Sequence, residues 1–279
     1  MPVQLCSSCP PQASRIGHHL LCLIRSLLLR WWSRRQSVFH LFSHRCARYD
    51  QDMCGRLSQG MTWQELYELY DLTGPAWDVR PRYNVRPTDE VSIIRLGADG
   101  RELVPAIWWL VPPWADGPNP KFPMFNARAE SLADKKSFAG PFRSRRCLIP
   151  FTGWFEWRAE GGRKQPYFLA LKSGPFAVAG LWEVSRRAAQ PIASCTVITC
   201  PANETVAAYH PKQRMPAILR PVDWTAWLDV ETVGPEFARD LLAPWPNEEM
   251  TVHKVDPRHV NAKIDTPLAI EAWGPTAER

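Results

Sequence analysis

The chain has 279 residues, of which 45% are hydrophobic and 22% are charged, and its formal net charge is +6. These proportions are those of an ordinary globular protein and argue against a fibrous or largely disordered chain. Residues 1–52 carry seven Arg and two Asp, so this segment holds most of the net positive charge. The overall basicity is therefore weak evidence for nucleic-acid binding by the remainder, where any such site must be a local basic patch.

We expect residues 1–52 to be a basic extension with no fold of its own. The run Met53-Cys54-Gly55-Arg56 resembles the true N-terminus of the protein. Arg25 interrupts the apolar stretch within 20–29, so neither a transmembrane helix nor a secretory signal is expected. Three interpretations of the extension stay open: an upstream start codon assigned in error, a processed leader such as an organelle transit peptide, or a functional appendage.

The eight cysteines suggest neither disulfides nor a metal site. Four lie before Met53 and four after it. The Cys6-x-x-Cys9 spacing lacks the second ligand pair of a zinc site, so we expect no metal and no cofactor. A domain of this size needs no disulfide framework, which favours a reducing compartment, and we expect the cytoplasm.

In chain order, the first predicted element after the extension is a helix. Thr62-Trp63-Gln64-Glu65 forms a capping box ahead of an apolar run, which predicts a short helix. Residues 80–84 are predicted to form a loop. Residues 91–95 and 104–111 are predicted to be strands, separated by a turn at Ala98-Asp99-Gly100.

The second half of the chain alternates short apolar runs with turn signals, the pattern of a strand-rich fold. Gly161-Gly162 predicts a turn between two strands, and two short helices are expected, from Asp223 through Trp227 and over 236–242. The expected strands are 147–149, 154–158, 167–171, 176–182, 195–199, 217–219 and 250–255. With no internal repeat, residues 53–268 are predicted to form one α+β domain, followed by a C-terminal tail at 269–279.

Cys54 would carry unusual chemistry if translation or processing made it the first residue. Its free α-amine and its thiol would then form a 1,2-aminothiol, which captures aldehydes. The amine condenses to an imine, the thiol adds to the imine, and a five-membered thiazolidine closes. Because the closing step is intramolecular, its effective molarity is high.

Two further side chains could assist such chemistry. His210 lies on a loop set by prolines, where it could act as an acid or base, although a histidine merely hydrogen-bonded in a turn is the commoner case. Glu156 lies in the aromatic run 153–157, where a buried carboxylate needs a partner or a raised pKa. Simple alternation, with Glu156 facing water, is the alternative. A carboxylate of tuned pKa beside an amine could accept and return a proton during imine formation.

The run Asn126-Ala127-Arg128-Ala129-Glu130 sets an amide, a cation and a carboxylate on alternate positions, which would point one way in an extended chain. Asn126 could orient a reacting group, and Arg128 could hold a phosphate. A surface salt bridge between Arg128 and Glu130 is the alternative.

The tryptophans near these motifs could stack on unpaired bases or fill the core, and core is the commoner case. They are Trp108, Trp109, Trp114 and Trp154. Trp114, on the Pro112-Pro113-Trp114 loop, is the best candidate for an exposed stacking platform.

As an ordered set, these motifs resemble the SRAP (SOS response-associated peptidase) family of abasic-site-processing proteins. No single run is decisive, but the series follows the family's order over about residues 53–268. The matching runs are Met-Cys-Gly-Arg at 53–56, Arg-Tyr-Asn at 82–84, Pro-Thr at 87–88, Trp108 to Trp114, Asn-Ala-Arg-Ala-Glu at 126–130, Arg-Cys-Leu-Ile-Pro at 146–150, Gly153 to Trp157, His210 to Pro216, and Val260-Asn261.

The resemblance implies a mainly antiparallel, barrel-like sheet with a few peripheral helices, in a monomer with no membrane or metal partner. Such a domain would bind single-stranded DNA and react with the ring-opened aldehyde of an abasic site, near the bacterial nucleoid. Cys54 would form a thiazolidine after Met53 leaves, and the family is thought to remove that methionine itself, as a peptidase. The crosslink would shield the lesion in the DNA damage response, and family members can also act as a lyase or reverse the bond.

The resemblance also implies roles for single residues. Glu156 would serve the proton transfers of the amine and imine. His210 would protonate the sugar oxygen, and Asn126 would position Cys54 or the sugar. The residues implied to contact DNA are Arg56, Arg128, Arg214 and Trp114.

Three features depart from the family pattern. Residues 1–52 have no counterpart and would keep the reactive amine in a peptide bond. Trp109 replaces a usual glycine. The usual His-x-Arg-Met-Pro is lengthened to His210-Pro211-Lys212-Gln213-Arg214-Met215-Pro216, which puts the relative geometry of His210 and Arg214 in question.

Two other classes of function stay open. An N-terminal-nucleophile amidohydrolase or peptidase would use the Cys54 thiolate against an acyl carbon, without DNA. A non-catalytic module for single-stranded DNA would use Cys54 only structurally, and its binding would weaken steeply with salt.

Overall fold

The structure is a computed structural model that describes residues 54–74, 79–261 and 264–274. The predictions for residues 1–52 lie outside the described residues. Within those residues, none of the helices has the length and apolar character needed to span a membrane.

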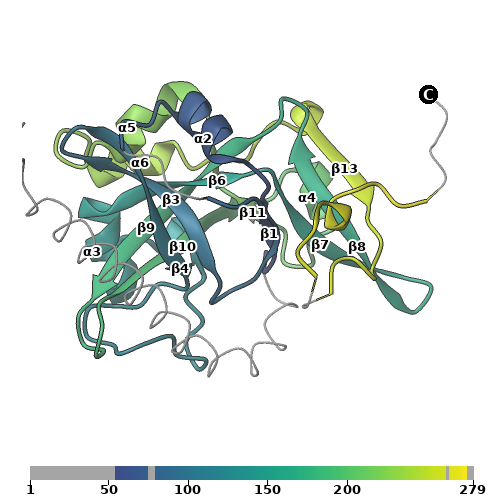
Figure 1. The fold of residues 1–279 in the computed structure, drawn as a ribbon, viewed down its shortest axis with the longest axis horizontal. Helices are drawn as coiled ribbons and strands as arrows, with labels where there is room; N and C mark the ends of the chain where they lie inside the picture. Colours follow the sequence, from purple (N-terminus) through teal and green to yellow (C-terminus); the bar gives the residue numbers. More distant parts are fainter. Residues whose placement is uncertain (1–53, 75–78, 262–263, 275–279) are drawn as a thin grey trace, which may run out of the picture. The chain divides into compact units, whose positions relative to one another are not determined.

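Five strands close a barrel (Figure 1). In the spatial order β4, β3, β6, β9 and β10 each strand pairs with the next, and β10 closes the ring by pairing with β4. Only the β4–β10 pairing in this ring is parallel. The barrel strands are β3 (Glu90–Gly97), β4 (Gly100–Trp108), β6 (Arg146–Phe151), β9 (Phe176–Ser185) and β10 (Ile192–Pro201). The prediction of an α+β domain with a mainly antiparallel, barrel-like sheet is therefore confirmed.

Close packing between β6 and β9 depends on Gly180. A Cβ atom at this position would lie 2.7 Å from the side chain of Ile149 and 3.0 Å from Sγ of Cys147. A Cβ contact of 2.7 Å is too short to persist, so a larger residue would force the side chain of Ile149, or the two strands, to move. The apolar residues of both strands are fully buried around this point, which makes it part of the main core.

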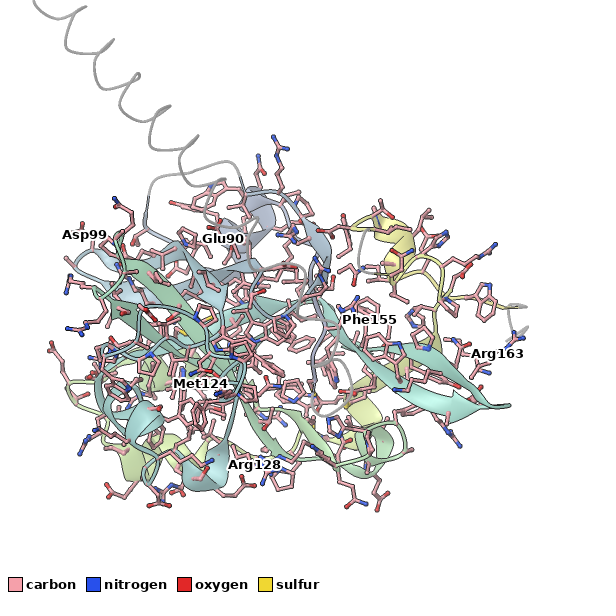
Figure 2. The ribbon with its side chains drawn as sticks, turned by 90° about the horizontal axis from the view of Figure 1, so that it is seen from below. Glu90, Asp99, Met124, Arg128, Phe155 and Arg163 are labelled. Carbon is pink, nitrogen blue, oxygen red and sulfur yellow. The ribbon has the colours of Figure 1, made fainter. Side chains whose placement is uncertain are left out.

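A second sheet carries the segment that follows Met53. Its strands, in spatial order, are β13 (Met250–Lys254), β8 (Arg163–Leu171), β7 (Gly153–Glu160), β1 (Leu57–Gln59) and β2 (Arg82–Val85). The predicted turn at Gly161-Gly162 joins β7 to β8, with φ of 55° and 76°, values that glycine adopts freely. Figure 2 shows Arg163 at the far end of this hairpin and Phe155 toward the interior.

Short strands and helices complete the fold. The capping box begins α2 as predicted, since Thr62 and Glu65 bond each other's backbone. Three short strands extend the barrel sheet: β5 (Asn126–Arg128) and β11 (Arg214–Pro216) beside β10, and β12 (Ile218–Leu219) beside β9. The helices are α2 (Trp63–Tyr70), α3 (Lys136–Ser144), α4 (Glu204–Ala207), α5 (Trp224–Leu228) and α6 (Pro235–Asp240), with 3-10 turns at Ala129–Ser131, Pro221–Asp223, Asn247–Glu249 and Pro267–Ala269.

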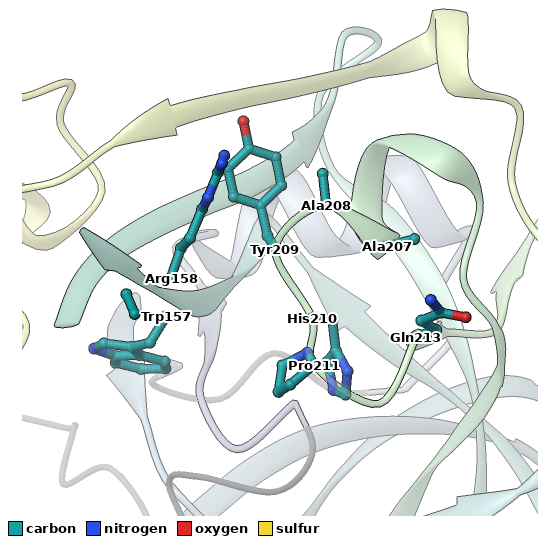
Figure 3. Close-up of a pocket in the computed structure, with 9 residues that line it drawn as sticks. Trp157, Arg158, Ala207, Ala208, Tyr209, His210, Pro211 and Gln213 are labelled. Atoms are coloured by element: carbon teal, nitrogen blue, oxygen red, sulfur yellow. The ribbon is translucent and has the colours of Figure 1, made fainter.

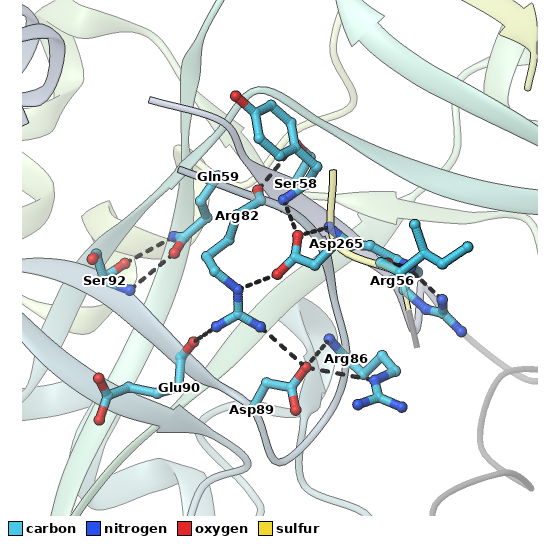
Figure 4. A network of polar contacts seen from close by, with 12 residues as sticks. Arg56, Ser58, Gln59, Arg82, Arg86, Asp89, Glu90, Ser92 and Asp265 are labelled. Atoms are coloured by element: carbon cyan, nitrogen blue, oxygen red, sulfur yellow. Dashed lines mark hydrogen bonds and ion pairs between the residues drawn. The ribbon is translucent and has the colours of Figure 1, made fainter. Parts of the chain in front are cut away.

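The loop predicted at 80–84 is wrong, because Arg82–Val85 forms strand β2. Asp265, far along the chain, stabilises strand β2. Its carboxylate accepts hydrogen bonds from the backbone N–H groups of Tyr83 and Asn84 and pairs with Arg82 (Figure 4). The segment continues to Trp273, whose N–H donates to Lys254 O at 2.8 Å. The residues after 268 that the structure describes are therefore attached to β13.

The strand predicted over 104–111 ends at Trp108. The N–H of Trp109 turns back to Ile107 O at 2.8 Å, so the ladder stops there. Trp108, Trp109 and Trp154 are all buried, as expected for core tryptophans, whereas Trp114 is 52% exposed.

Candidate functional site

The register of β1 against β7 brings Cys54 beside Glu156. Leu57 lies opposite Trp154 and Ser58 opposite Gly153. The N–H of Phe155 donates to Arg56 O at 3.0 Å, which continues the same antiparallel path toward Cys54. The short strand β1 thus sets the first described residue of the domain against the middle of β7.

Cys54, Glu156 and His210 meet in the interior. Sγ of Cys54, a carboxylate oxygen of Glu156 and a ring nitrogen of His210 all lie within 4.8 Å of one another. Nε2 of His210 is 4.0 Å from Oε1 of Glu156. The three residues are no more than 5% exposed. Glu156 therefore does not face water. His210 is hydrogen-bonded within its turn, and its ring also lies beside Cys54 and Glu156.

Asn126 joins the group from a third element. Strand β5 runs parallel to β10, with Asn126 opposite Val197. The Nδ2 group of Asn126 donates to Cys54 O at 3.0 Å. Among the described residues, Oδ1 of Asn126, Oε1 of Glu156 and Nε2 of His210 have no hydrogen-bond partner. Buried polar atoms without partners are costly, so a polar group that enters between Glu156 and His210, whose atoms lie 4.0 Å apart, would satisfy both.

Burial sets the protonation of the site. It raises the pKa of Glu156 to about 8, against the opposing contacts of Cys54 and Trp154. Burial, and then the carboxylate of Glu156, raise the pKa of the Cys54 thiol well above its usual range. Burial lowers the pKa of His210 to about 4, and the charges of Lys212 and Arg214 act in the same direction. Near neutral pH the thiol and the imidazole are uncharged, and Glu156 is poised to exchange a proton.

An open pocket of about 240 Å³ adjoins the buried residues. Trp157, Arg158, Tyr209 and His210 line it, and the guanidinium of Arg158 lies 5.8 Å from the Tyr209 ring centre (Figure 3). His210 belongs both to the pocket wall and to the buried group. The pocket therefore sets an aromatic and cationic surface directly beside the unpartnered polar atoms.

The strand expected through the 126–130 run ends at Arg128, because Glu130 lies in a 3-10 turn. Asn126 is buried, whereas Arg128 and Glu130 are exposed, so the three side chains do not form one site. Glu130 pairs with Arg214, whose two terminal nitrogens lie 2.6 and 3.0 Å from the two carboxylate oxygens. Figure 2 shows Arg128 at the edge of the molecule.

The residues predicted to contact DNA occupy different environments. Arg56 is buried and donates to Oδ1 of Asn84 at 2.6 Å and to Val260 O at 2.9 Å. Arg214 is held by Glu130, and Trp114 is exposed, with Nζ of Lys136 5.1 Å from its ring centre. Their roles stay predictions, and the surroundings of Arg56 favour a structural one.

Sequence reasoning missed Asn84 and Asp265, which hold Arg56 and strand β2. Nδ2 of Asn84 also donates to Asn261 O at 2.9 Å. Both residues act across more than 170 positions of sequence. The Arg-Tyr-Asn motif at 82–84 was a signal that this segment mattered, but no local pattern gave its partners.

Residues 53–262 match the family described as SOS response associated peptidase (SRAP). The chain belongs to the SRAP family. The match begins at Met53 and includes Cys54, Asn126, Glu156 and His210.

Two bacterial relatives are named as abasic site processing proteins. The chain is 34% identical over 226 residues to the "Abasic site processing protein YoqW" of Bacillus subtilis, covering 79% of this chain and all of that protein. It is 30% identical over 219 residues to "Abasic site processing protein YedK" of Escherichia coli, covering 76% of this chain and 96% of that one. A crystal structure of a Bacteroides thetaiotaomicron protein has the same fold, with a TM-score of 0.71 and 24% identity, over 79% of this chain and all of that one.

Proposed function

We propose that this protein processes abasic sites in single-stranded DNA by forming a covalent thiazolidine through Cys54. The proximity of Cys54, Glu156 and His210, with Asn126 on the carbonyl of Cys54, is the observation that carries the proposal. Family membership and the names of the relatives give the substrate class. The partner is DNA containing an abasic site, met in the cytoplasm at the nucleoid, by a protein that acts as a monomer.

The reaction requires a free α-amine on Cys54. Hydrolysis of the Met53–Cys54 peptide bond consumes one water and releases that amine. A self-processing peptidase activity would use the same buried residues, because the carboxyl group of Glu156 lies within 4.8 Å of the Cys54 sulfur. A start at Met53 leaves only this single residue to remove.

The amine then attacks the aldehyde of the ring-opened sugar and forms a carbinolamine. Protonated Glu156 gives its proton to the carbinolamine hydroxyl, the C–O bond breaks, and water leaves as the iminium forms. The carboxylate of Glu156 takes the thiol proton, and the sulfur adds to the iminium carbon. The ring closes as a neutral thiazolidine, and Glu156 ends protonated as it began, so one water is released in total.

The pKa values suit these steps. A carboxyl group with a pKa of about 8 holds a proton at neutral pH and can return it after the carbinolamine collapses. Thiol addition needs a local base, because burial raises the pKa of Cys54. The Asn126 contact with Cys54 O fixes the backbone from which both the amine and the thiol project.

The proposal is tested by intact mass spectrometry on two proteins, the full chain and one that begins at Met53, before and after single-stranded DNA with one abasic site is added. We expect the shorter protein to lack the methionine and to gain the mass of the DNA less one water. The same DNA without the abasic site is the control. An adduct that persists when the α-amine is acetylated would reject the thiazolidine mechanism.

The full chain reports on the extension. If it loses residues 1–53 and then forms the adduct, the extension is processed. If it stays inert while the shorter protein reacts, the full chain does not release Cys54 by itself, which favours a start at Met53. Absence of an adduct from both proteins would leave a non-covalent module for single-stranded DNA as the function.

A further inference from the structure

The loop after His210 holds the imidazole ring from its Nδ1 side. The backbone N–H of Lys212 donates to Nδ1 at 3.1 Å, and that of Arg214 donates to the same atom at 3.4 Å. A ring nitrogen that accepts N–H bonds carries a lone pair there and no hydrogen. In a neutral imidazole the single ring hydrogen must then lie on Nε2.

The geometry of one turn produces both contacts. The N–H of Gln213 donates to His210 O at 3.0 Å, which closes a β-turn with Pro211 in its second position, where proline is favoured. Gln213 has a φ of 51°, in the left-handed region. This conformation brings the chain back over the ring before Arg214 enters β11 on β10. Figure 3 shows Pro211 and Gln213 on the two sides of His210.

The opposite edge of the ring faces the reacting groups. Nε2 is buried, has no hydrogen-bond partner among the described residues, and lies 4.0 Å from Oε1 of Glu156. The other ionisable groups around the ring are the thiol of Cys54 and the cations of Lys212 and Arg214. Burial and both cations disfavour the imidazolium and outweigh a backbone hydrogen bond that favours it, so the pKa of His210 falls to about 4 and the ring is neutral near pH 7.

We propose that the Pro211–Arg214 turn is a positioning element that fixes His210 as the Nε2–H tautomer, so that His210 acts as a hydrogen-bond donor. Its use as a donor rests on the proposed function, whereas the tautomer is a property of the free protein. An oxygen about 2.8 Å from both Nε2 and Oε1 fits a separation of this size. It would accept from His210 and exchange a proton with Glu156, as the carbinolamine hydroxyl does while it leaves as water.

The tautomer also decides what the buried group cannot bind. On spacing alone, Cys54, Glu156 and His210 could act as three metal ligands. A histidine ligand binds zinc through a ring lone pair, and its other nitrogen then carries a hydrogen that it donates. At His210 the nitrogen that faces the group bears the hydrogen, and Nδ1 meets two donors. The residues present therefore do not fit a metal ion.

The tautomer is tested by long-range ¹H–¹⁵N NMR of the imidazole groups in the ¹⁵N-labelled full chain, with His210 assigned through His210→Gln. We expect His210 at pH 7 to show the pattern of a protonated Nε2 and an unprotonated Nδ1, unchanged by one equivalent of Zn²⁺. A protonated Nδ1, an imidazolium at pH 7, or a shift of the His210 signals with Zn²⁺ would overturn the inference.

Two variants at Gln213 test the positioning role. Gln213→Gly adopts a positive φ freely and should keep both the tautomer signal and the rate of adduct formation. Gln213→Ile is strained there and should give mixed tautomers, with a loss in rate of at least about tenfold. An unchanged rate in Gln213→Ile despite mixed tautomers would overturn the role. If the unmodified protein forms no adduct while its NMR pattern is as expected, the proposed function fails and the tautomer assignment stands.

Discussion

Two buried cysteines in this molecule differ in the ionisable groups that surround their sulfur atoms. Cys195 lies on β10 and is fully buried, and burial alone raises the pKa of its thiol. Cys54 is buried to nearly the same degree, but Glu156 and His210 lie within 4.8 Å of its sulfur. Burial by itself leaves a thiol inert. An acid and an imidazole beside the thiol, with Oε1 of Glu156 and Nε2 of His210 lacking hydrogen-bond partners among the described residues, distinguish the candidate site from the core.

The sharpest test of this comparison replaces each cysteine with alanine in a separate variant. We expect Cys54→Ala to abolish the heat-stable DNA adduct, because an imine without a thiol cannot close to a thiazolidine. Cys195→Ala should keep it, since that thiol has no part in the site. Denaturing gel electrophoresis after incubation with abasic DNA measures both. A stable adduct in Cys54→Ala would place the chemistry elsewhere.

Two buried glutamates allow a second matched comparison. Glu156→Gln should lower the rate of adduct formation by about 10²- to 10⁴-fold, the usual contribution of a general acid or base. Glu183 is also buried, but it pairs with Arg145 at 2.8 Å, outside the candidate site. Glu183→Gln should weaken the fold and leave the rate within about threefold. Single-turnover kinetics on soluble, folded protein measures each, and equal losses in both variants would refute the special role of Glu156.

Asn126 tests whether the backbone of Cys54 must be held in place. Asn126→Ala removes the 3.0 Å bond to Cys54 O, whose loss costs about 1–3 kcal/mol when the carbonyl stays buried. We expect the adduct to form about 10 to 100 times more slowly, with the Cys54 thiazolidine still the product. Asn203→Ala, at the N-cap of α4, is the control that should weaken the fold without slowing the chemistry. Peptide mapping of the adduct identifies the product in each case.

The raised pKa of Glu156 predicts a pH-dependent stability. Its folded value of about 8 lies above the ordinary 4.3 or so, so the folded state binds more protons and the free energy of unfolding falls as pH rises between these values. His210, lowered to about 4, acts with the opposite sign, but only up to its ordinary pKa of about 6.5. Between about pH 6.5 and 8 the His210 contribution no longer changes, and the titration of Glu156 lowers the free energy of unfolding by about 2 kcal/mol.

Urea unfolding at pH 6.5 and pH 8 measures this loss, and Glu156→Gln should show almost none. The protein must retain Met53, checked by mass, because a free α-ammonium group beside Glu156 would lower its pKa. An identical loss in the variant would assign the pH dependence to another group.

The smallest expected effect concerns the exposed surface. Trp114→Ala should weaken binding to single-stranded DNA by about 1 kcal/mol, the low end for an aromatic that stacks on a base. Trp273, 46% exposed on the C-terminal segment, provides the control, and Trp273→Ala should change the affinity little. Fluorescence anisotropy at fixed salt compares them, and equal effects would remove Trp114 from the DNA surface.

The sequence by itself determined the local elements and the family. The Thr62–Glu65 capping box, the Gly161-Gly162 turn and most strands follow from short-range patterns that the fold preserves. The ordered motifs also contained every residue of the candidate site. These features are local or depend on order along the chain, so a sequence displays them directly.

Only the tertiary structure decided which side chains meet. The contact between Asn126 and Cys54 spans 72 positions, and that between Arg214 and Glu130 spans 84. The same long-range pairing turned the predicted loop at 80–84 into a strand through Asp265, and it buried Arg56 against Val260. Such contacts depend on how sheets close and register, and on which groups must be satisfied once buried, and neither can be read from neighbours in sequence.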